Sequence, residues 1–298
     1  MKIIIICIVI KNLSVVKVLP VDFHLEIRQN NVAKICKLGY TGYMLYLGTS
    51  GFSYDDWVGH FYPAGMPKRE WLVYYACEFN TCEVNSTYYA IPRASSLKSM
   101  ADKTGDGFLF SIKANQEMTH QREDNASVFE AFRQVLQPVI SDGKLGCILA
   151  QFPNSFRPDR RNWDYLKLFR ERVDDLPVVI EFRNARWLTD ELFDWLRQQD
   201  LGFCCVDEPH LPNLLPPVAE VTSKIGYIRF HGRNSAKWWR HDHAYERYDY
   251  TYSPSELSEW LPKIEKLDKI AERTFIFANN HWRGQAVDTI RQLRMMLD

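Results

Sequence analysis

Eight short apolar segments, alternating with segments of helical periodicity, constrain the fold of this chain more than any other feature. The apolar segments lack strict alternation of polar and apolar residues, which is typical of parallel strands covered on both faces. Eight strand–helix units over about 250 residues favour a single α/β domain, a TIM (β/α)8 barrel, over an open doubly wound sheet. The expected strands are residues 45–50, 81–84, 107–113, 145–151, 177–183, 201–206, 225–231 and 274–278.

Helices are expected between these strands, at residues 68–79, 92–103, 127–139, 163–172, 189–198, 254–267 and 285–297. Ser253 and Pro254 form a helix-start signal, because proline is tolerated in the first turn. No G-x-G-x-x-G or G-x-x-x-x-G-K sequence follows the first strand, which argues against a nucleotide-binding sheet. The domain is expected to span residues 44–298.

The charge balance argues against a protein that coats nucleic acid with its whole surface. Lys+Arg and Asp+Glu both number 37 in 298 residues, so any anion binding must be local. The seven cysteines include no C-x-x-C pair, which favours reduced thiols in a cytoplasmic protein over a disulfide framework.

Residues 1–43 differ in character from the rest of the chain. The apolar run at 3–10 is too short to span a bilayer, so no membrane partner is expected. The segment shows neither a helical nor a strand period, and the first expected strand begins directly after Met44. We interpret residues 1–43 as a non-native upstream extension with Met44 as the true start. The alternative is a genuine but disordered N-terminal arm.

Polar residues gather at the C-terminal ends of the expected strands, where TIM barrels carry their active sites. The segment 227–233, Y-I-R-F-H-G-R, is the clearest case. Arg229, His231 and Arg233 are two residues apart and share one side of an extended chain, and Gly232 permits a sharp exit from the strand. Seven of the eight strand ends carry such groups, which predicts a polar site at the barrel mouth.

The residue types at these ends suit acid–base chemistry on an anionic compound. His231 or His281 is predicted to shuttle a proton, with Glu83 or Glu181 as the partner acid or base. Arginine guanidiniums give bidentate contacts to phosphate or carboxylate. The predicted substrate-binding residues are Lys113, Arg183, Arg229, Arg233, Asn85, Gln151, Asn280, Tyr54, Trp57 and Trp238.

A purely structural interpretation of the same residues stays open. Glu181 and Arg183 would form an ion pair with Arg229 or Lys113 that stiffens the barrel mouth, and Glu83 would balance a neighbouring cation. The amides at the strand ends would then be hydrogen-bonding loop residues.

The loop at 234–252, N-S-A-K-W-W-R-H-D-H-A-Y-E-R-Y-D-Y-T-Y, interleaves cations with aromatic residues. Its length is typical of a lid or binding loop, and its composition suits stacking on a base or sugar ring beside an anion. Its rings would otherwise pack on the barrel rim. The H-D-H sequence at 241–243 invites a divalent metal, with partners among His231, His281, Glu181 and Asp207. Nothing fixes their spacing, so no metal ligand and no cofactor is assigned.

Several motifs resemble the domain-of-unknown-function 72 family (YecE-like). They are G-T-S-G-F-S-Y-D-D-W at 48–57, F-N-T-C-E-V-N-S-T-Y-Y at 79–89, F-S-I-K at 110–113, T-H at 119–120, L-A-Q-F-P-N-S-F at 149–156, I-E-F-R-N-A-R-W at 180–187, I-R-F-H-G-R at 228–233 and F-A-N-N-H-W-R-G-Q-A at 277–286. The resemblance implies a TIM barrel related in fold to xylose isomerase and endonuclease IV-like barrels, and no established activity. Cys82 and Asn184 depart from the expected aliphatic residue and histidine, and Asn184 cannot titrate.

Two functional classes follow. The first is an enzyme with an anion-binding pocket at the mouth, a hydrolase or isomerase acting on a phosphorylated or sugar-like substrate. The second is a non-catalytic protein that binds a nucleotide or a nucleic-acid end with the loop at 234–252. The sequence leaves open whether the protein is an enzyme and which oligomer it forms. A small anionic ligand is the expected partner, and nucleic acid is the less favoured one.

Overall fold

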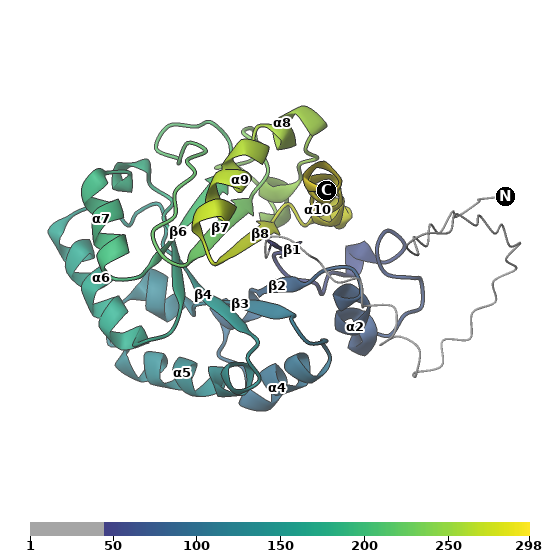
Figure 1. Cartoon of the computed structure of the whole chain (residues 1–298), viewed down its shortest axis with the longest axis horizontal. Coiled ribbons are helices and arrows are strands. Elements are labelled where there is room, and N and C mark those ends of the chain that lie inside the picture. Colours follow the sequence, from purple (N-terminus) through teal and green to yellow (C-terminus); the bar gives the residue numbers. More distant parts are fainter. Residues whose placement is uncertain (1–44) are drawn as a thin grey trace, which may run out of the picture. The chain divides into compact units, whose positions relative to one another are not determined.

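The computed structural model describes residues 45–298, and eight parallel strands form its centre. The strands are β1 Leu45–Thr49, β2 Thr81–Val84, β3 Leu109–Lys113, β4 Leu145–Gln151, β5 Val178–Glu181, β6 Gly202–Asp207, β7 Ile225–Phe230 and β8 Arg273–Ala278. They pair in the order β1-β8-β7-β6-β5-β4-β3-β2, and Figure 1 shows helices arranged around them. The predicted extension at 1–43 and the start at Met44 lie outside the described residues.

The barrel closes where β1 meets β2. Ser50 forms a parallel bridge with Glu83, and the Gly51 N–H donates to the Glu83 carbonyl at 2.8 Å. At Gly48 a Cβ atom would lie 2.2 Å from the Thr81 carbonyl oxygen, so only glycine allows this approach. The single (β/α)8 barrel predicted from the sequence is therefore confirmed.

Helices separate the strands along the chain, except that residues 208–224 between β6 and β7 form no helix. They are α2 Trp71–Ala76, α3 Ser86–Tyr89, α4 Ala94–Asp102, α5 Ala126–Ser141, α6 Arg160–Val173, α7 Asp190–Gln198, α8 Pro254–Ser258, α9 Leu261–Ile270 and α10 Gln285–Leu297. Side-chain caps fix several starts: Asp159 accepts from the Asn162 N–H, and Ser253 forms a capping box with Glu256, which satisfies N–H groups that lack helical partners.

One predicted helix is divided. The expected helix at 254–267 is two helices, α8 and α9, with Pro262 in the first turn of the second. Proline has no N–H for the preceding turn, and its ring collides with the carbonyl four residues earlier. The prediction of one continuous helix is therefore wrong.

Polarity inside the barrel increases from the N-terminal to the C-terminal ends of the strands. Near the N-terminal end, the Tyr46 and Phe275 rings stack at 4.8 Å, and Gly146 leaves room for Phe275. In the middle, the Ser111 and Tyr227 hydroxyls lie 2.7 Å apart. Charged side chains occupy the next level and carry the candidate site. Among residues 45–298, no helix has the length and apolar character needed to cross a membrane.

Candidate functional site

Arg229 lies at the centre of a buried ion network at the barrel mouth. Its Nη2 is 2.7 Å from Glu83 Oε1 and its Nη1 is 2.5 Å from Glu181 Oε2, and all three side chains are buried. The Tyr227 hydroxyl donates to Glu83 Oε2 at 2.8 Å. Because a buried charge requires a partner, this geometry gives Arg229 two compensating carboxylates from within the protein.

Arg183 is also held between carboxylates. Its Nε lies 2.5 Å from Glu181 Oε1, an ion-pair contact in which the N–H is not directed at the oxygen, and its Nη1 donates to Glu208 Oε2 at 3.0 Å. Burial raises the pKa of Glu208 to about 7, although Arg183 opposes the shift. Burial also raises the pKa of Glu181, but Arg183, Arg229 and His231 outweigh it and hold that pKa well below its ordinary value. Glu181 therefore stays ionised.

His231 is fully buried beside this network. Asn279 Nδ2 lies 3.0 Å from His231 Nδ1, and His231 Nε2 lies 3.1 Å from Glu181 Oε1. An amide nitrogen only donates, so this pattern assigns the proton to Nε2. Burial and the charge of Arg183 hold the pKa of His231 well below its ordinary value, and the ring is neutral near pH 7.

Arg233 binds Asp207 and Glu259, the residue that follows α8. Its Nε and Nη2 lie 2.9 and 2.7 Å from the two Asp207 oxygens, and Nη2 also lies 2.9 Å from Glu259. Asp207 accepts two further hydrogen bonds, from the Tyr252 hydroxyl at 2.6 Å and from Trp260 Nε1 at 2.7 Å. Arg233 thus has carboxylate partners of its own.

Tyr252 also joins the two ends of the loop at 234–252. Its hydroxyl accepts from the Gly232 N–H at 2.9 Å while it donates to Asp207. The start and the end of the loop are therefore fixed at one oxygen atom.

Lys113 differs from these arginines. Its half-buried Nζ donates to Gln151 Oε1 at 2.9 Å and lies 4.7 Å from the centre of the Tyr88 ring. Within residues 45–298, no carboxylate lies at ion-pair distance from this nitrogen. Burial and the nearby charge of Arg229 lower the pKa of Lys113 to about 8.

His120 and Tyr88 complete this side of the mouth, and neither was a predicted site residue. His120 lies on a π-helical turn, Glu117–Gln121, and its ring meets Tyr88 edge to face at 5.1 Å. Burial and the charge of Lys113 lower the pKa of His120 to about 4. Single π-helical turns are frequent at functional sites. The available sequence signal was the T-H pair at 119–120.

Two predicted amides carry buried oxygens that accept no hydrogen bond from the described protein groups: Asn85 Oδ1 and Asn280 Oδ1. The Nδ2 of Asn280 donates to the Tyr250 carbonyl at 2.8 Å and to Thr289 Oγ1 at 2.9 Å. Asn85 precedes α3 without capping it through its side chain. Buried acceptors without donors are uncommon, and such atoms suit a bound polar group.

His281, Tyr54 and Trp57 form a separate aromatic group between β1 and β8. Tyr54 stacks on His281 at 4.6 Å, and Trp57 Nε1 donates to the His281 carbonyl at 2.7 Å. Burial lowers the pKa of His281, and its Nδ1 is buried without a described partner. Trp57 has no exposed surface, so this geometry gives it packing contacts with the protein.

The loop at 234–252 uses two of its cations internally. Lys237 Nζ lies 2.7 Å from Glu246, and Arg247 donates to the Trp238 carbonyl at 2.9 Å. The buried Trp238 ring lies 5.9 Å from the guanidinium carbon of Arg183. Tyr245 stacks on Trp282 at 3.9 Å, which joins the loop to the segment after β8.

Comparison with known proteins identifies the family. A family model described as "Protein of unknown function DUF72" matches residues 46–298. The chain belongs to the DUF72 family. The UPF0759 protein YunF of Bacillus subtilis (strain 168) is 29% identical over 271 residues, covering 86% of this chain and 95% of YunF.

Solved DUF72 structures have the same fold. A DUF72 family protein (TM1631) from Thermotoga maritima MSB8 is similar with a TM-score of 0.79 and 36% identity, covering 85% of this chain and 99% of that one. A second (EF0366), from Enterococcus faecalis V583, gives a TM-score of 0.76 and 27% identity, covering 85% and 95%.

The mouth of this DUF72 barrel therefore has two parts. One is the buried ion network around Arg229, in which the charges balance one another. The other is the arc of Lys113, Gln151, Tyr88 and His120, which presents a half-buried amine beside a neutral imidazole. In residues 45–298, no three His, Cys, Asp or Glu side chains are grouped to hold a metal ion.

Proposed function

We propose that this DUF72 protein is an enzyme that binds a small phosphorylated or sugar-like anion at the barrel mouth and moves a proton on it, as a hydrolase or an isomerase does. The observation that carries the proposal is the position of Lys113, a half-buried cation with no carboxylate within ion-pair distance in residues 45–298.

The charge balance favours Lys113 over the arginines as the anion-binding group. Arg183, Arg229 and Arg233 are bound to internal carboxylates, so an incoming anion would compete with buried ion pairs. The ammonium of Lys113 has three N–H donors, and Gln151 accepts one of them. Within the described part of the chain the other donors have no acceptor, which supports a ligand there.

A neutral imidazole beside Tyr88 supports the proton-transfer step. The lowered pKa of His120 leaves its ring neutral near pH 7, and a neutral imidazole accepts a proton. His231 is neutral as well, but its Nδ1 already accepts from Asn279 and its Nε2 donates to Glu181. Glu181 accepts from His231 at 3.1 Å and would position it rather than titrate. Glu83 balances the charge of Arg229 and is likewise assigned no proton-transfer role.

A thermal-shift screen across sugar phosphates, free sugars, short carboxylates and nucleotides tests binding, because a ligand of the folded state raises the apparent melting temperature. We expect a shift in the wild type that Lys113→Met abolishes and the surface variant Lys98→Met retains. NMR of the bound compounds then tests turnover. Ligand shifts that persist in Lys113→Met would refute the assigned site, and a bound compound that stays unchanged would refute the enzymatic role.

The second candidate, a nucleotide or nucleic-acid-end binder, is supported by the exposed side chains of Trp239 and Arg240 in the loop at 234–252. Fluorescence titration with short oligonucleotides at several salt concentrations tests it, since phosphate contacts give a salt-dependent affinity. Binding that is steeply salt-dependent and lost in Trp239→Ala and Arg240→Ala would favour this candidate.

A further inference from the structure

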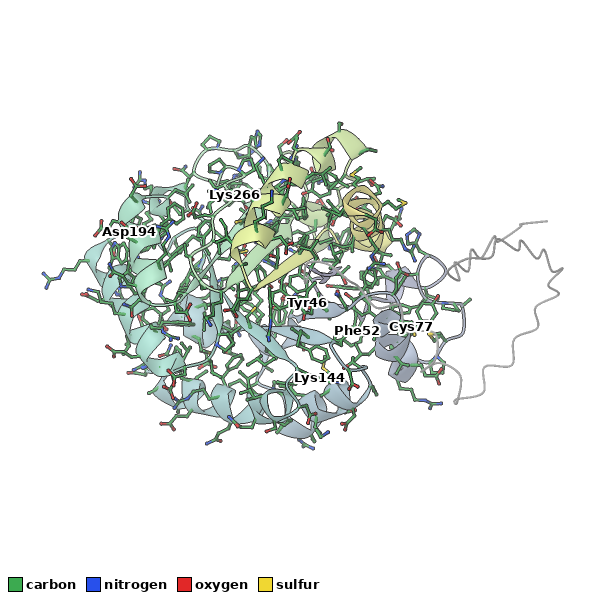
Figure 2. All side chains as sticks on the ribbon, in the orientation of Figure 1. Tyr46, Phe52, Cys77, Lys144, Asp194 and Lys266 are labelled. Atoms are coloured by element: carbon green, nitrogen blue, oxygen red, sulfur yellow. The ribbon has the colours of Figure 1, made fainter. Side chains whose placement is uncertain are left out.

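Lys113 differs from Lys144 and Lys98, two other lysines with defined contacts, in the chemistry of its neighbours. Lys144, labelled in Figure 2, donates to the Ala101 carbonyl and to the carbonyl and hydroxyl of Thr104, and Lys98 contacts two aspartates. Lys113 instead contacts one neutral amide and one aromatic face. This environment holds the nitrogen in place without a counter-charge.

Burial reduces the cost of deprotonating this amine. Burial and the cations Arg229 and Arg183 lower the pKa of Lys113, Glu181 and Glu83 raise it, and the result is about 8. At pH 7.5 about a quarter of the molecules then carry the neutral amine, against about one in a thousand for an ordinary lysine. Desolvation of this kind is one way in which proteins activate lysine nucleophiles.

We propose that Lys113 is a nucleophilic amine that condenses with the carbonyl group of an aldehyde or ketone, such as an open-chain sugar, to form an imine. The proposal rests on the proposed function and narrows its substrate class to carbonyl compounds.

The step balances without an oxidant or a reductant. The nitrogen lone pair attacks the carbonyl carbon, a C–N bond forms, and the carbonyl π electrons move to oxygen. A proton passes from nitrogen to that oxygen, which gives a carbinolamine. Its hydroxyl then leaves as water after protonation, and the nitrogen lone pair forms the C=N bond.

The neighbouring groups fit the product as well as the reactant. A protonated imine is a cation, and it would lie against the face of Tyr88, where the amine nitrogen is 4.7 Å from the ring centre; a cation over an aromatic face is stabilised. The imine also acidifies the adjacent C–H. The neutral ring of His120, which touches the same tyrosine, is placed to accept that proton, as isomerisation of a sugar requires.

Reductive trapping tests the proposal. The full chain is incubated with limiting glycolaldehyde and cyanoborohydride, and modified lysines are located by peptide mass spectrometry. We expect each modified lysine to gain the mass of the aldehyde less one oxygen atom. The modified fraction of Lys113 should be at least tenfold that of Lys144. The rate of Lys113 labelling should rise with pH and reach half of its maximum near pH 8. Lys113→Arg keeps the cation and removes the nucleophile, so it should lose this adduct.

Labelling spread evenly over surface lysines, or labelling of Lys113 no faster than of Lys144, would overturn the imine. The outcome is distinguishable from a failure of the proposed function. If ligands raise the melting temperature in a Lys113-dependent way but no adduct forms, the proposed anion-binding enzyme stands and the imine proposal is refuted. If Lys113 forms a selective adduct but no screened compound binds or is turned over, the reactive amine is supported and the proposed function is refuted.

Discussion

Arg229 Nη1 lies 2.5 Å from Glu181 Oε2, and this ion pair joins β7 to β5 across the interior of the barrel mouth, with both side chains buried. The second Arg229 contact, to Glu83 on β2, extends the connection to a third strand. The pair therefore holds the strand ends that carry the candidate site at fixed positions.

Arg229→Met is expected to lower the free energy of unfolding by about 3–5 kcal/mol, because it removes the guanidinium shared by two buried carboxylates and leaves Glu83 without a cation. Urea denaturation monitored by tryptophan fluorescence measures this change. Lys98→Met, which removes a surface ion pair with Asp102, serves as the control and should leave the midpoint nearly unchanged. An Arg229→Met protein as stable as the wild type would show that the network does not support the fold.

Gly48→Ala is expected to destabilise the barrel by about 3 kcal/mol or more, because the added methyl group would collide with backbone where β1 meets β2. The clash involves the Thr81 carbonyl oxygen at 2.2 Å, whereas a Cβ at Gly105 meets nothing within 4 Å. Gly105→Ala is therefore the matched control and should unfold at the wild-type urea concentration. Equal stability of the two variants would contradict the described closure.

Stability should fall as the pH falls from about 6.5 to about 4, because unfolded His120 binds a proton in this range that the folded protein, with a His120 pKa of about 4, does not. The slope from this residue is at most about 1.4 kcal/mol per pH unit, reduced by its partial exposure. His120→Gln should flatten the curve of urea midpoint against pH in this window.

Glu208 acts in the opposite direction over part of the same range. Its raised pKa, about 7, costs stability as the pH rises from its unfolded value toward 7. Subtracting the His120→Gln curve from the wild-type curve cancels the contribution of Glu208, because both proteins contain it. If the two curves run parallel between pH 6.5 and 4, His120 is protonated equally in the folded and unfolded states and the prediction is wrong.

Tyr245→Ala is expected to speed tryptic cleavage within the loop at 234–252 without changing the urea midpoint of the barrel. The Tyr245 ring stacks on Trp282 at 3.9 Å and 9°, a contact worth about 0.5–1.5 kcal/mol beyond area burial. Time-resolved mass spectrometry would follow cleavage after Arg240 and Arg247. Tyr89→Ala, at an exposed tyrosine outside this loop, is the control that should leave the cleavage rate unchanged.

The strands could be predicted because parallel strands covered on both faces leave continuous apolar runs. The same reasoning located the polar ends at Glu83, Glu181 and Arg229. It offered both Arg229 and Lys113 as partners for Glu181 and could not decide between them, since the contacts of Arg229 join residues 48 and 146 positions apart in the chain. Such pairings depend on how the barrel closes.

Tyr88 and His120 were not assigned as site residues for a related reason. Tertiary hydrogen bonds fix their positions: Thr87 Oγ1 donates to the Lys113 carbonyl at 2.6 Å, and Asn115 Nδ2 donates to the Thr87 carbonyl at 3.0 Å. These bonds hold the short helix α3 and the start of the π-helical turn in position beside β3. Neither element has a hydrophobic period that a sequence could reveal.

The hydroxyl of Tyr252, which binds both the Gly232 N–H and Asp207, brings the two ends of the intervening segment together at the barrel. Because both ends of this segment meet at one atom, its length and composition can change without moving β6 or β7. Insertions and deletions within this segment are therefore expected to leave these strands in place, although the contacts of Trp238 and Tyr245 with the rest of the protein would change.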